Sequence, residues 1–198
     1  MAKQKNITYQ AAHKLIIDRY IDLCIKESSF PTNISYLASK ISISRPTMYA
    51  HFKSIEELED EILNYGIAKI EERMDMEHYN LLFKDPRAYF TKLADSINER
   101  DAQIYKMLIK SSHFFEIIDQ SAKIVTQYIK SYNKNAIKDK YDECISEFFI
   151  KGELMLFFSY FDKKNKYKIY EIAETCAYAY ERLFKEWIKA HNGKTKAK

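Results

Sequence analysis

The chain has 198 residues, of which 46% are hydrophobic, and it carries a net charge of +4 with only 3 Gly and 3 Pro. A chain of this length can bury a sizeable core in one or two domains, and the scarcity of glycine and proline predicts an all-α fold. No uncharged apolar run is long enough for a signal peptide or a membrane span, and Cys24, Cys144 and Cys176 lack the paired spacing of zinc sites and disulfide frameworks. We therefore expect a cytoplasmic protein with buried thiols and with no metal or other cofactor.

The first predicted helix spans about Thr8 to Lys26. Its apolar positions recur at helical spacing and are expected to face inward. Arg19 is the one polar residue close to this stripe. The helix should pack across two shorter helices that follow it and complete a three-helix core. The residues of the stripe are Ala12, Leu15, Ile16, Tyr20 and Leu23.

Two short helical patterns joined by a three-residue break come next. Thr32 is placed to cap the N-terminus of the first pattern. Ser44 is placed to cap the second, whose first turn tolerates Pro46 because the N–H that proline lacks has no helical partner there. The arrangement is a helix-turn-helix signature. The apolar stripe of the first helix is Ile34, Leu37 and Ala38, and the break is Ile41-Ser42-Ile43.

The second of these helices carries side chains that suit contact with DNA. Met48 and Phe52 lie i, i+4 on its buried face, which leaves its N-terminal end exposed for the major groove. An arginine there can pair with guanine, a threonine or proline can contact a thymine methyl, and a tyrosine hydroxyl can reach a phosphate. A packing role is the alternative for His51. The predicted DNA-binding residues are Thr32, Ser44, Arg45, Pro46, Thr47, Tyr49, His51 and Lys53.

The runs T-N-I-S-Y-L-A and I-S-R-P-T-M-Y-A-H-F-K-S, followed by E-E-L, resemble the DNA-binding domain of the tetracycline-repressor (TetR) family over about residues 7–63. Ser54 and Glu57 in this stretch form an S-x-x-E capping box that opens the next helix. The resemblance implies an all-helical homodimer. Its helix-turn-helix domain, residues 1–63, binds a palindromic operator, and a larger helical domain, residues 64–190, binds a small inducer and dimerises.

Two positions depart from the family pattern. Ser42 stands where glycine is usual, so a left-handed backbone there would cost about 1 kcal/mol, unless the turn adopts another shape. Ile55 stands where many members have a second lysine. One phosphate contact that the resemblance implies is therefore missing.

Positive charge is concentrated in the segment that contains this motif. Residues 1–55 hold eight Lys and Arg against three Asp and Glu, which gives +5, so the remaining residues sum to −1. A basic surplus attracts DNA phosphates through counterion release, whatever the base sequence. A solvated basic face without a partner is the alternative, and the coincidence with the motif favours double-stranded DNA.

Breaks in the later pattern predict helices near 56–79, 86–98, 101–110, 112–132, 139–161 and 166–190, to within two to four residues, and a disordered basic tail over 191–198. Residues 64–78 would connect a ligand site to the DNA-binding helices. An aromatic-lined cavity between the middle helices would suit an apolar or aromatic molecule, although ordinary packing explains most such residues. The predicted ligand-binding residues are Phe90, Tyr105, Phe114, Phe115 and Tyr128.

The last two predicted helices carry broad apolar stripes, and the helix over 139–161 is apolar almost all round. A monomer of this size has few elements left to enclose it. A four-helix bundle with a second copy is the simplest solution, and intramolecular core is the alternative for part of the stripes. The predicted interface residues are Phe149, Gly152, Met155, Phe158, Cys176, Tyr180, Leu183 and Trp187.

The function that these patterns favour is a TetR-like repressor that binds its operator as a homodimer and is released by a small apolar or aromatic inducer. The first alternative is a DNA-binding dimer controlled by a protein partner, without a small ligand. A helical enzyme that uses His113 with Glu116 as an acid–base pair is a remote alternative. No nucleophile, glycine-rich phosphate loop or metal-ligand cluster accompanies that pair, so we expect no enzymatic activity.

Overall fold

The computed structural model describes residues 2–72, 81–132, 137–162 and 165–184, and all regular secondary structure within these ranges is helical. The predicted all-α class is confirmed. The predicted tail over 191–198 lies outside the described residues, as does the end of the predicted connecting helix. The helices are α1 (Ala2–Glu27), α2 (Ile34–Lys40), α3 (Arg45–His51), α4 (Ile55–Glu71), α6 (Pro86–Asp95), α7 (Glu99–Leu108), α8 (Phe114–Tyr132), α9 (Lys140–Ser159) and α10 (Ile169–Ala179), with a π-helical turn η1 (Tyr180–Phe184) after α10.

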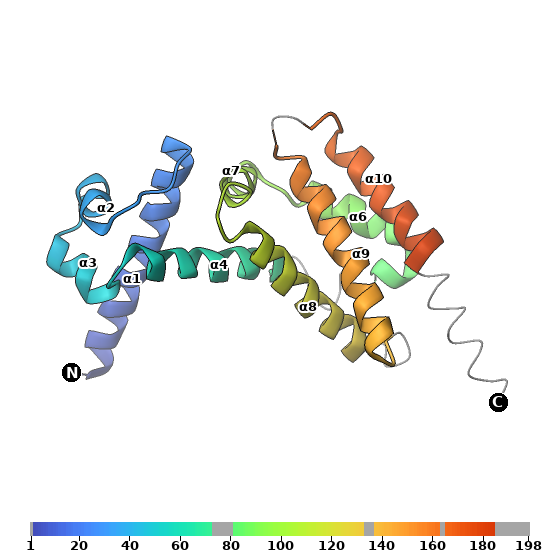
Figure 1. The fold of residues 1–198 in the computed structure, drawn as a ribbon, viewed down its shortest axis with the longest axis horizontal. Helices are drawn as coiled ribbons and strands as arrows, with labels where there is room; N and C mark the ends of the chain where they lie inside the picture. Colours follow the sequence, from blue (N-terminus) through green and yellow to red (C-terminus); the bar gives the residue numbers. More distant parts are fainter. Residues whose placement is uncertain (1, 73–80, 133–136, 163–164, 185–198) are drawn as a thin grey trace.

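Helices α1, α2 and α3 lie at one end of the molecule and α6, α9 and α10 at the other, with α4 running from the first group towards the second (Figure 1). The predicted starts and ends of α6 to α9, and the predicted start of α10, agree with the structure to within three residues. Helix α1 begins at Ala2, six residues before the predicted start.

The buried stripe of α1 follows the prediction with one exception. Ile16 and Tyr20 are fully buried and Leu23 is nearly so, whereas Leu15 is 45% exposed. Residues 16, 20 and 23 share one helical face, and residue 15 lies about 100° away from residue 16 around the axis. The prediction that Leu15 faces inward is wrong, because the stripe is narrower than the apolar pattern.

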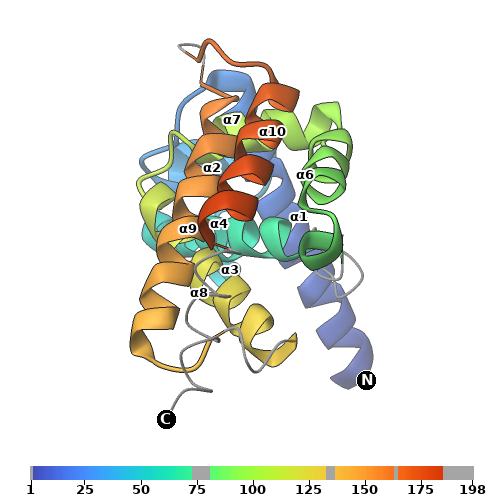
Figure 2. The ribbon, with the colours of Figure 1, turned by 90° about the vertical axis from the view of Figure 1, so that its right-hand side faces the viewer.

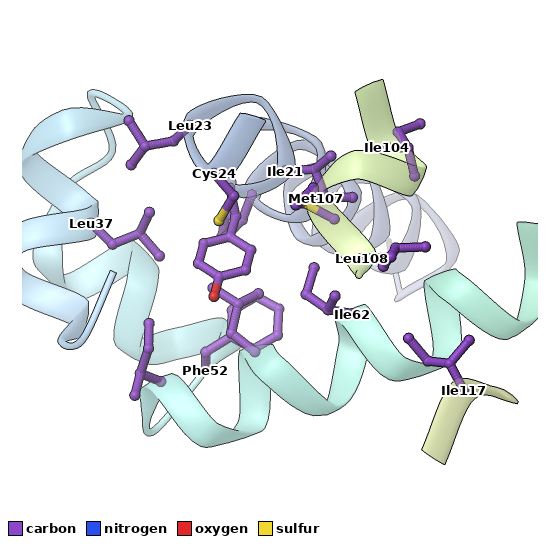
Figure 3. Close-up of a cluster of buried hydrophobic side chains, with 14 of the residues drawn as sticks. Ile21, Leu23, Cys24, Leu37, Phe52, Ile62, Ile104, Met107, Leu108 and Ile117 are labelled. Atoms are coloured by element: carbon purple, nitrogen blue, oxygen red, sulfur yellow. The ribbon is translucent and has the colours of Figure 1, made fainter. Parts of the chain in front are cut away.

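One hydrophobic cluster joins the two ends of the molecule. It extends from Leu37 and Phe52, beside α1, through Ile62 of α4 to Leu108 of α7 and Ile117 of α8 (Figure 3). An ion pair between Arg100 of α7 and Asp22 of α1 adds a polar link. The core is therefore continuous across residue 63, where the sequence suggested a boundary.

The far end of the molecule is a helical bundle in which α8 and α9 run antiparallel. Asp119 pairs with Lys151, the Thr126 hydroxyl donates to Ser146 Oγ at 3.3 Å, and Lys130 pairs with Glu143, so one residue number rises as the other falls. Helix α10 lies between α6 and α9 and packs along α6 (Figure 2). Helix α6 begins where Asp85-Pro86 predicts, because Asp85 Oδ1 accepts the Ala88 N–H at 3.0 Å.

Among the described residues, no helix combines the length and the apolar character that crossing a membrane requires. Cys24 and Cys176 are buried thiols, as predicted, but Cys144 is exposed on α9. The expectation of a third buried thiol is wrong, since Cys144 lies about 160° around the axis of α9 from Ser146, which is fully buried.

Candidate nucleic-acid interface

The N-terminus of α2 is capped by Asn33. Its backbone is extended, and its Oδ1 accepts the Tyr36 N–H at 2.8 Å. Thr32, the predicted cap, lies one residue too early and is exposed. Both residue types cap helices well, so sequence preference alone does not choose between them.

The turn between α2 and α3 is tight and left-handed at Ser42. Ser42 has φ of 55°, and the Ile43 N–H bonds to the Ala38 carbonyl at 3.0 Å, as in a Schellman motif. Of the two predicted shapes, the chain adopts the left-handed one without glycine. Arg19 Nη1 donates to the Ile41 carbonyl at 2.7 Å, which ties the turn to α1.

Helix α3 is buried on one face and exposed on the other. Met48 is fully buried. Arg45, Pro46 and Thr47 are exposed, and Tyr49 is 51% exposed. Ser44 Oγ caps the helix by accepting the Thr47 N–H at 3.2 Å, as predicted. The helix is thus anchored by its inner face and presents its first turn to the outside.

The chain after α3 is held by a second cap. Ser54 Oγ accepts the Glu57 N–H at 3.3 Å, as the capping box predicts. In a capping box the Glu57 carboxylate would also accept the N–H of Ser54. Here Glu57 Oε2 instead accepts the N–H of Lys53, the residue before the cap, at 2.6 Å. The backbone of Lys53 is fixed by this bond, and its side chain is exposed next to α3.

His51 occupies a ring stack between α1 and α3. Its ring centroid lies 4.2 Å from that of Tyr9, whose hydroxyl donates to the Ala50 carbonyl at 3.2 Å. His13 stacks on Phe52 at 4.6 Å beside it. Burial, and next the nearby His13, lower the pKa of His51. The stacked imidazole fits the packing role that is the alternative for His51, while its predicted contact with DNA stays a prediction.

Two of the predicted ligand-binding residues, Phe90 and Tyr105, line a cavity of about 80 Å³ whose other lining residues come mainly from α4, α6, α8, α9 and the turn η1. Phe114 lies outside the lining, although its ring contacts that of Phe158, which belongs to it, at 5.3 Å between centroids. Phe115 is 73% exposed and Tyr128 is 37% exposed, and neither lines the cavity. The predictions for these two residues are wrong, because the aromatic pattern of α8 does not show which of its side chains other helices cover.

The cavity also contains Glu153, which the sequence analysis missed. Its Oε1 is buried without a hydrogen-bond partner among the described residues, and burial raises its pKa to about 8. Glu153 is the only acid between Gly152 and Tyr160 of the nearly all-apolar run. A lone carboxyl inside such a run was the available signal.

The predicted interface residues divide into interior and exposed groups. Phe158, Cys176 and Tyr180 are no more than 5% exposed in the single chain, so their predicted place at an interface is wrong, because side chains of the chain's own core already cover them. Phe149 lines the cavity. Gly152 is exposed and Met155 is 37% exposed on α9. The Leu183 side chain and Trp187 lie outside the described residues.

An exposed apolar stripe remains on α9. Phe148 is 71% exposed and Tyr141 is 67% exposed, and both share the face of Gly152 and Met155.

His113 and Glu116, the acid–base pair of the enzyme alternative, lie at the start of α8. His113 Nδ1 and Glu116 Oε2 are 3.5 Å apart. Comparison with protein-family models, curated proteins and solved structures finds no match of any of the three kinds.

Proposed function

We propose that this protein is a transcriptional regulator that binds double-stranded DNA as a homodimer through α3 and responds to a small ligand. The observation that supports this most is the two-sided character of α3. Arg45, Thr47 and Tyr49 are exposed at its outer side, whereas Met48 on its inner side is fully buried. A short, rigidly held helix with this division is the geometry in which side chains read a major groove.

The residue types suggest separate roles. Arg45 can pair with guanine O6 and N7, which specifies a base. Tyr49 and Lys53 can contact the phosphate backbone, which positions the helix without specifying sequence. The left-handed turn at Ser42 and the Arg19 bond to Ile41 hold α3 at a fixed angle to α1. This preorganisation favours specific binding, because less conformational entropy is lost on contact.

A homodimer follows from the requirements of a palindromic operator. Two copies of α3 must lie about 34–36 Å apart, or a multiple of that distance, to enter successive major grooves. The exposed α9 stripe of Tyr141, Phe148, Gly152 and Met155 is a surface on which two copies can pack. Large exposed apolar residues at helical spacing are frequent at such contacts.

Control by a ligand requires that binding favours one of two dimer arrangements. The cavity at the bundle end is the candidate ligand site, and its coupling to DNA binding is expected to be about 1–3 kcal/mol. The alternative of a partner protein shares the DNA-binding end and differs only in having no ligand in this cavity.

The proposal is tested by selection from a random duplex library at low and moderate salt, with the purified protein. We expect enrichment of a palindrome whose half-site centres are about 10–10.5 base pairs apart, or a multiple of that spacing. Enrichment of a single asymmetric site would contradict the dimer. Failure to retain any duplex at low salt, where phosphate contacts are strongest, would contradict DNA binding altogether.

A further inference from the structure

We propose that the cavity binds a small apolar molecule that carries one positive charge, with the Glu153 carboxylate as its countercharge. The inference rests on the proposed function only in treating this molecule as the effector that controls DNA binding. Occupation of the cavity does not depend on DNA.

Glu153 is placed by α9 inside an apolar enclosure. It lies on the same helical face as Phe149 and Phe157, one turn before and one turn after it, and all three line the cavity. Tyr180, the first residue of the π-helical turn after α10, completes the wall. Single π-helical turns occur often at functional sites.

The carboxyl has no countercharge of its own. Among the described residues, no Lys, Arg or His lines the cavity, and Oε1 of Glu153 has no hydrogen-bond partner. The titratable groups facing it are Tyr89 of α6, Tyr105 of α7, Cys176 of α10 and Tyr180 of η1. None of these carries a positive charge. Burial, and next the charge of Glu153, raise the pKa of both Cys176 and Tyr180.

A cation satisfies this site better than any other class of ligand. Oε1 of the carboxyl is shielded from water although the residue as a whole is only half-buried, and burial raises its pKa to about 8, so the carboxyl is largely protonated at neutral pH. A positive charge beside the carboxyl favours its ionised form. The cation and the carboxylate then attract each other strongly, because little water screens the pair. A ligand without a polar group leaves the carboxyl unpaired, a neutral hydrogen-bonding group gains no charge attraction from it, and an anion is repelled once the carboxyl ionises.

The aromatic walls add to the attraction of a cation. Phe90 stacks on Phe157 with centroids 6.1 Å apart, and the edge-to-face pair Tyr89–Phe90 has centroids 4.9 Å apart. The faces of aromatic rings attract ammonium groups, quaternary ones included. Apart from Glu153 and the tyrosine hydroxyls, the lining offers hydrocarbon and aromatic carbon, so the rest of the ligand must be apolar.

The size of the cavity connects binding to movement. Its volume of about 80 Å³ is smaller than the cavity of about 150 Å³ that accommodates benzene in an engineered protein, so a larger ligand must displace side chains. Ile70, Tyr105, Phe158 and Phe161 line the cavity and also belong to the cluster that reaches α1, α2 and α3. Expansion of the cavity therefore pushes on α4, which carries Ile70.

The test compares two probes of the same shape by calorimetric titration of the full chain without DNA. Benzyltrimethylammonium carries a permanent charge, and neopentylbenzene is its neutral counterpart. We expect the wild-type protein to bind the cation at least about tenfold more tightly and to release close to one proton at pH 7. Glu153→Gln should reduce the preference to within about threefold. Glu147→Gln, which removes an acid of the same helix that pairs with Lys151, should keep it.

Equal affinity of the two probes for the wild-type protein would overturn the proposal, as would undiminished cation binding by a folded Glu153→Gln variant. Absence of cation binding to the wild-type protein would do the same. DNA binding is measured in the same preparation, so the two proposals fail separately. Operator binding without cation binding refutes only the ligand class, and cation binding without duplex binding refutes only the proposed function.

Discussion

Gly66 of α4 lies directly against Ile117 of α8, so that a Cβ atom on Gly66 would be 2.8 Å from Ile117 Cδ1 and 3.3 Å from its Cγ1. Ile117 is fully buried in the cluster that joins the two ends of the molecule. The absence of a side chain at residue 66 therefore sets how closely α4 approaches α8. This contact therefore fixes how α4 packs on the helical bundle.

Gly66→Ala should destabilise the protein by about 1 kcal/mol. Alanine is favoured over glycine inside a helix by about 1 kcal/mol, but overpacking of a rigid β-branched neighbour costs about 1–3 kcal/mol. Ile117→Val, which removes Cδ1, should cost about 0.5–1.5 kcal/mol alone. The free energy of unfolding is measured in urea.

The double variant separates this contact from general helix effects. If the two residues touch as described, Gly66→Ala should become stabilising in the Ile117→Val background, with a coupling energy above about 1 kcal/mol. Additivity of the two changes within about 0.5 kcal/mol would show that residue 66 does not press on Ile117.

The left-handed turn at Ser42 predicts an unusual order of substitutions. Ser42→Gly relieves about 1 kcal/mol of backbone strain but loses part of it to the greater freedom of the unfolded chain, so its stability should equal or slightly exceed that of the wild type. Ser42→Val, with a β-branched side chain at φ of 55°, should cost about 1–2 kcal/mol. Thermal unfolding of both variants measures the difference, and equal tolerance of valine and glycine would contradict the turn geometry.

Local chemistry made the α2–turn–α3 region predictable from sequence. Ser44 and Ser54 cap their helices because serine oxygens accept orphan N–H groups, and the buried pair Met48 and Phe52 follows from i, i+4 spacing. The cap of α2 was misplaced by one residue, from Asn33 to Thr32, since adjacent residues offered equivalent acceptors.

The interior of the bundle was less predictable, because periodicity identifies an apolar face but not what covers it. Helix α9 is apolar on nearly every side, so Phe158 was assigned to an interface although it is buried, while the exposed Phe148 was not. The cavity depends on how α4, α6, α7, α8, α9 and η1 are spaced, which no single sequence pattern encodes. Glu153 was not predicted because an aromatic pattern identifies packing residues and does not show that an acid is enclosed among them.

The buried carboxyl of Glu153 predicts a pH dependence of stability. Its pKa rises from the ordinary 4.5 to about 8 on folding, so the folded state binds a proton that the unfolded state has lost between these values. Its contribution to stability is therefore present below pH 4.5 and is lost as the pH rises through 8. The free energy of unfolding of Glu153→Gln, relative to that of the wild type, should therefore rise by roughly 1–3 kcal/mol between pH 5 and pH 8.

Chemical denaturation at both pH values checks this, with Glu147→Gln as the control that removes a partly exposed acid from the same helix. If the free energies of unfolding of Glu153→Gln and the wild type differ by the same amount at pH 5 and at pH 8, the carboxyl is solvated and the prediction is wrong. The control should show no comparable rise.

The α9 stripe predicts how the dimer is lost. Phe148→Glu places a charge in the proposed contact and should yield folded monomer by light scattering, because an unpaired charge in an apolar interface is costly. Phe115→Glu on α8 is the matched control, since both phenylalanines are more than two-thirds exposed, at 71% and 73%. If only Phe115→Glu dissociates the dimer, the contact lies on α8. If the dimer stays intact in both variants, the α9 stripe does not form the dimer contact.

The most direct test of the account is the response of DNA binding to two changes on adjacent parts of the proposed interface, measured by fluorescence anisotropy on the selected operator and on random duplex across a salt series. Arg45→Ala should lose about 1–3 kcal/mol on the operator and little on random DNA, and Lys53→Ala should weaken both equally and reduce the salt slope by about one. If both variants bind operator and random duplex as the wild type does, α3 is not the surface that meets DNA.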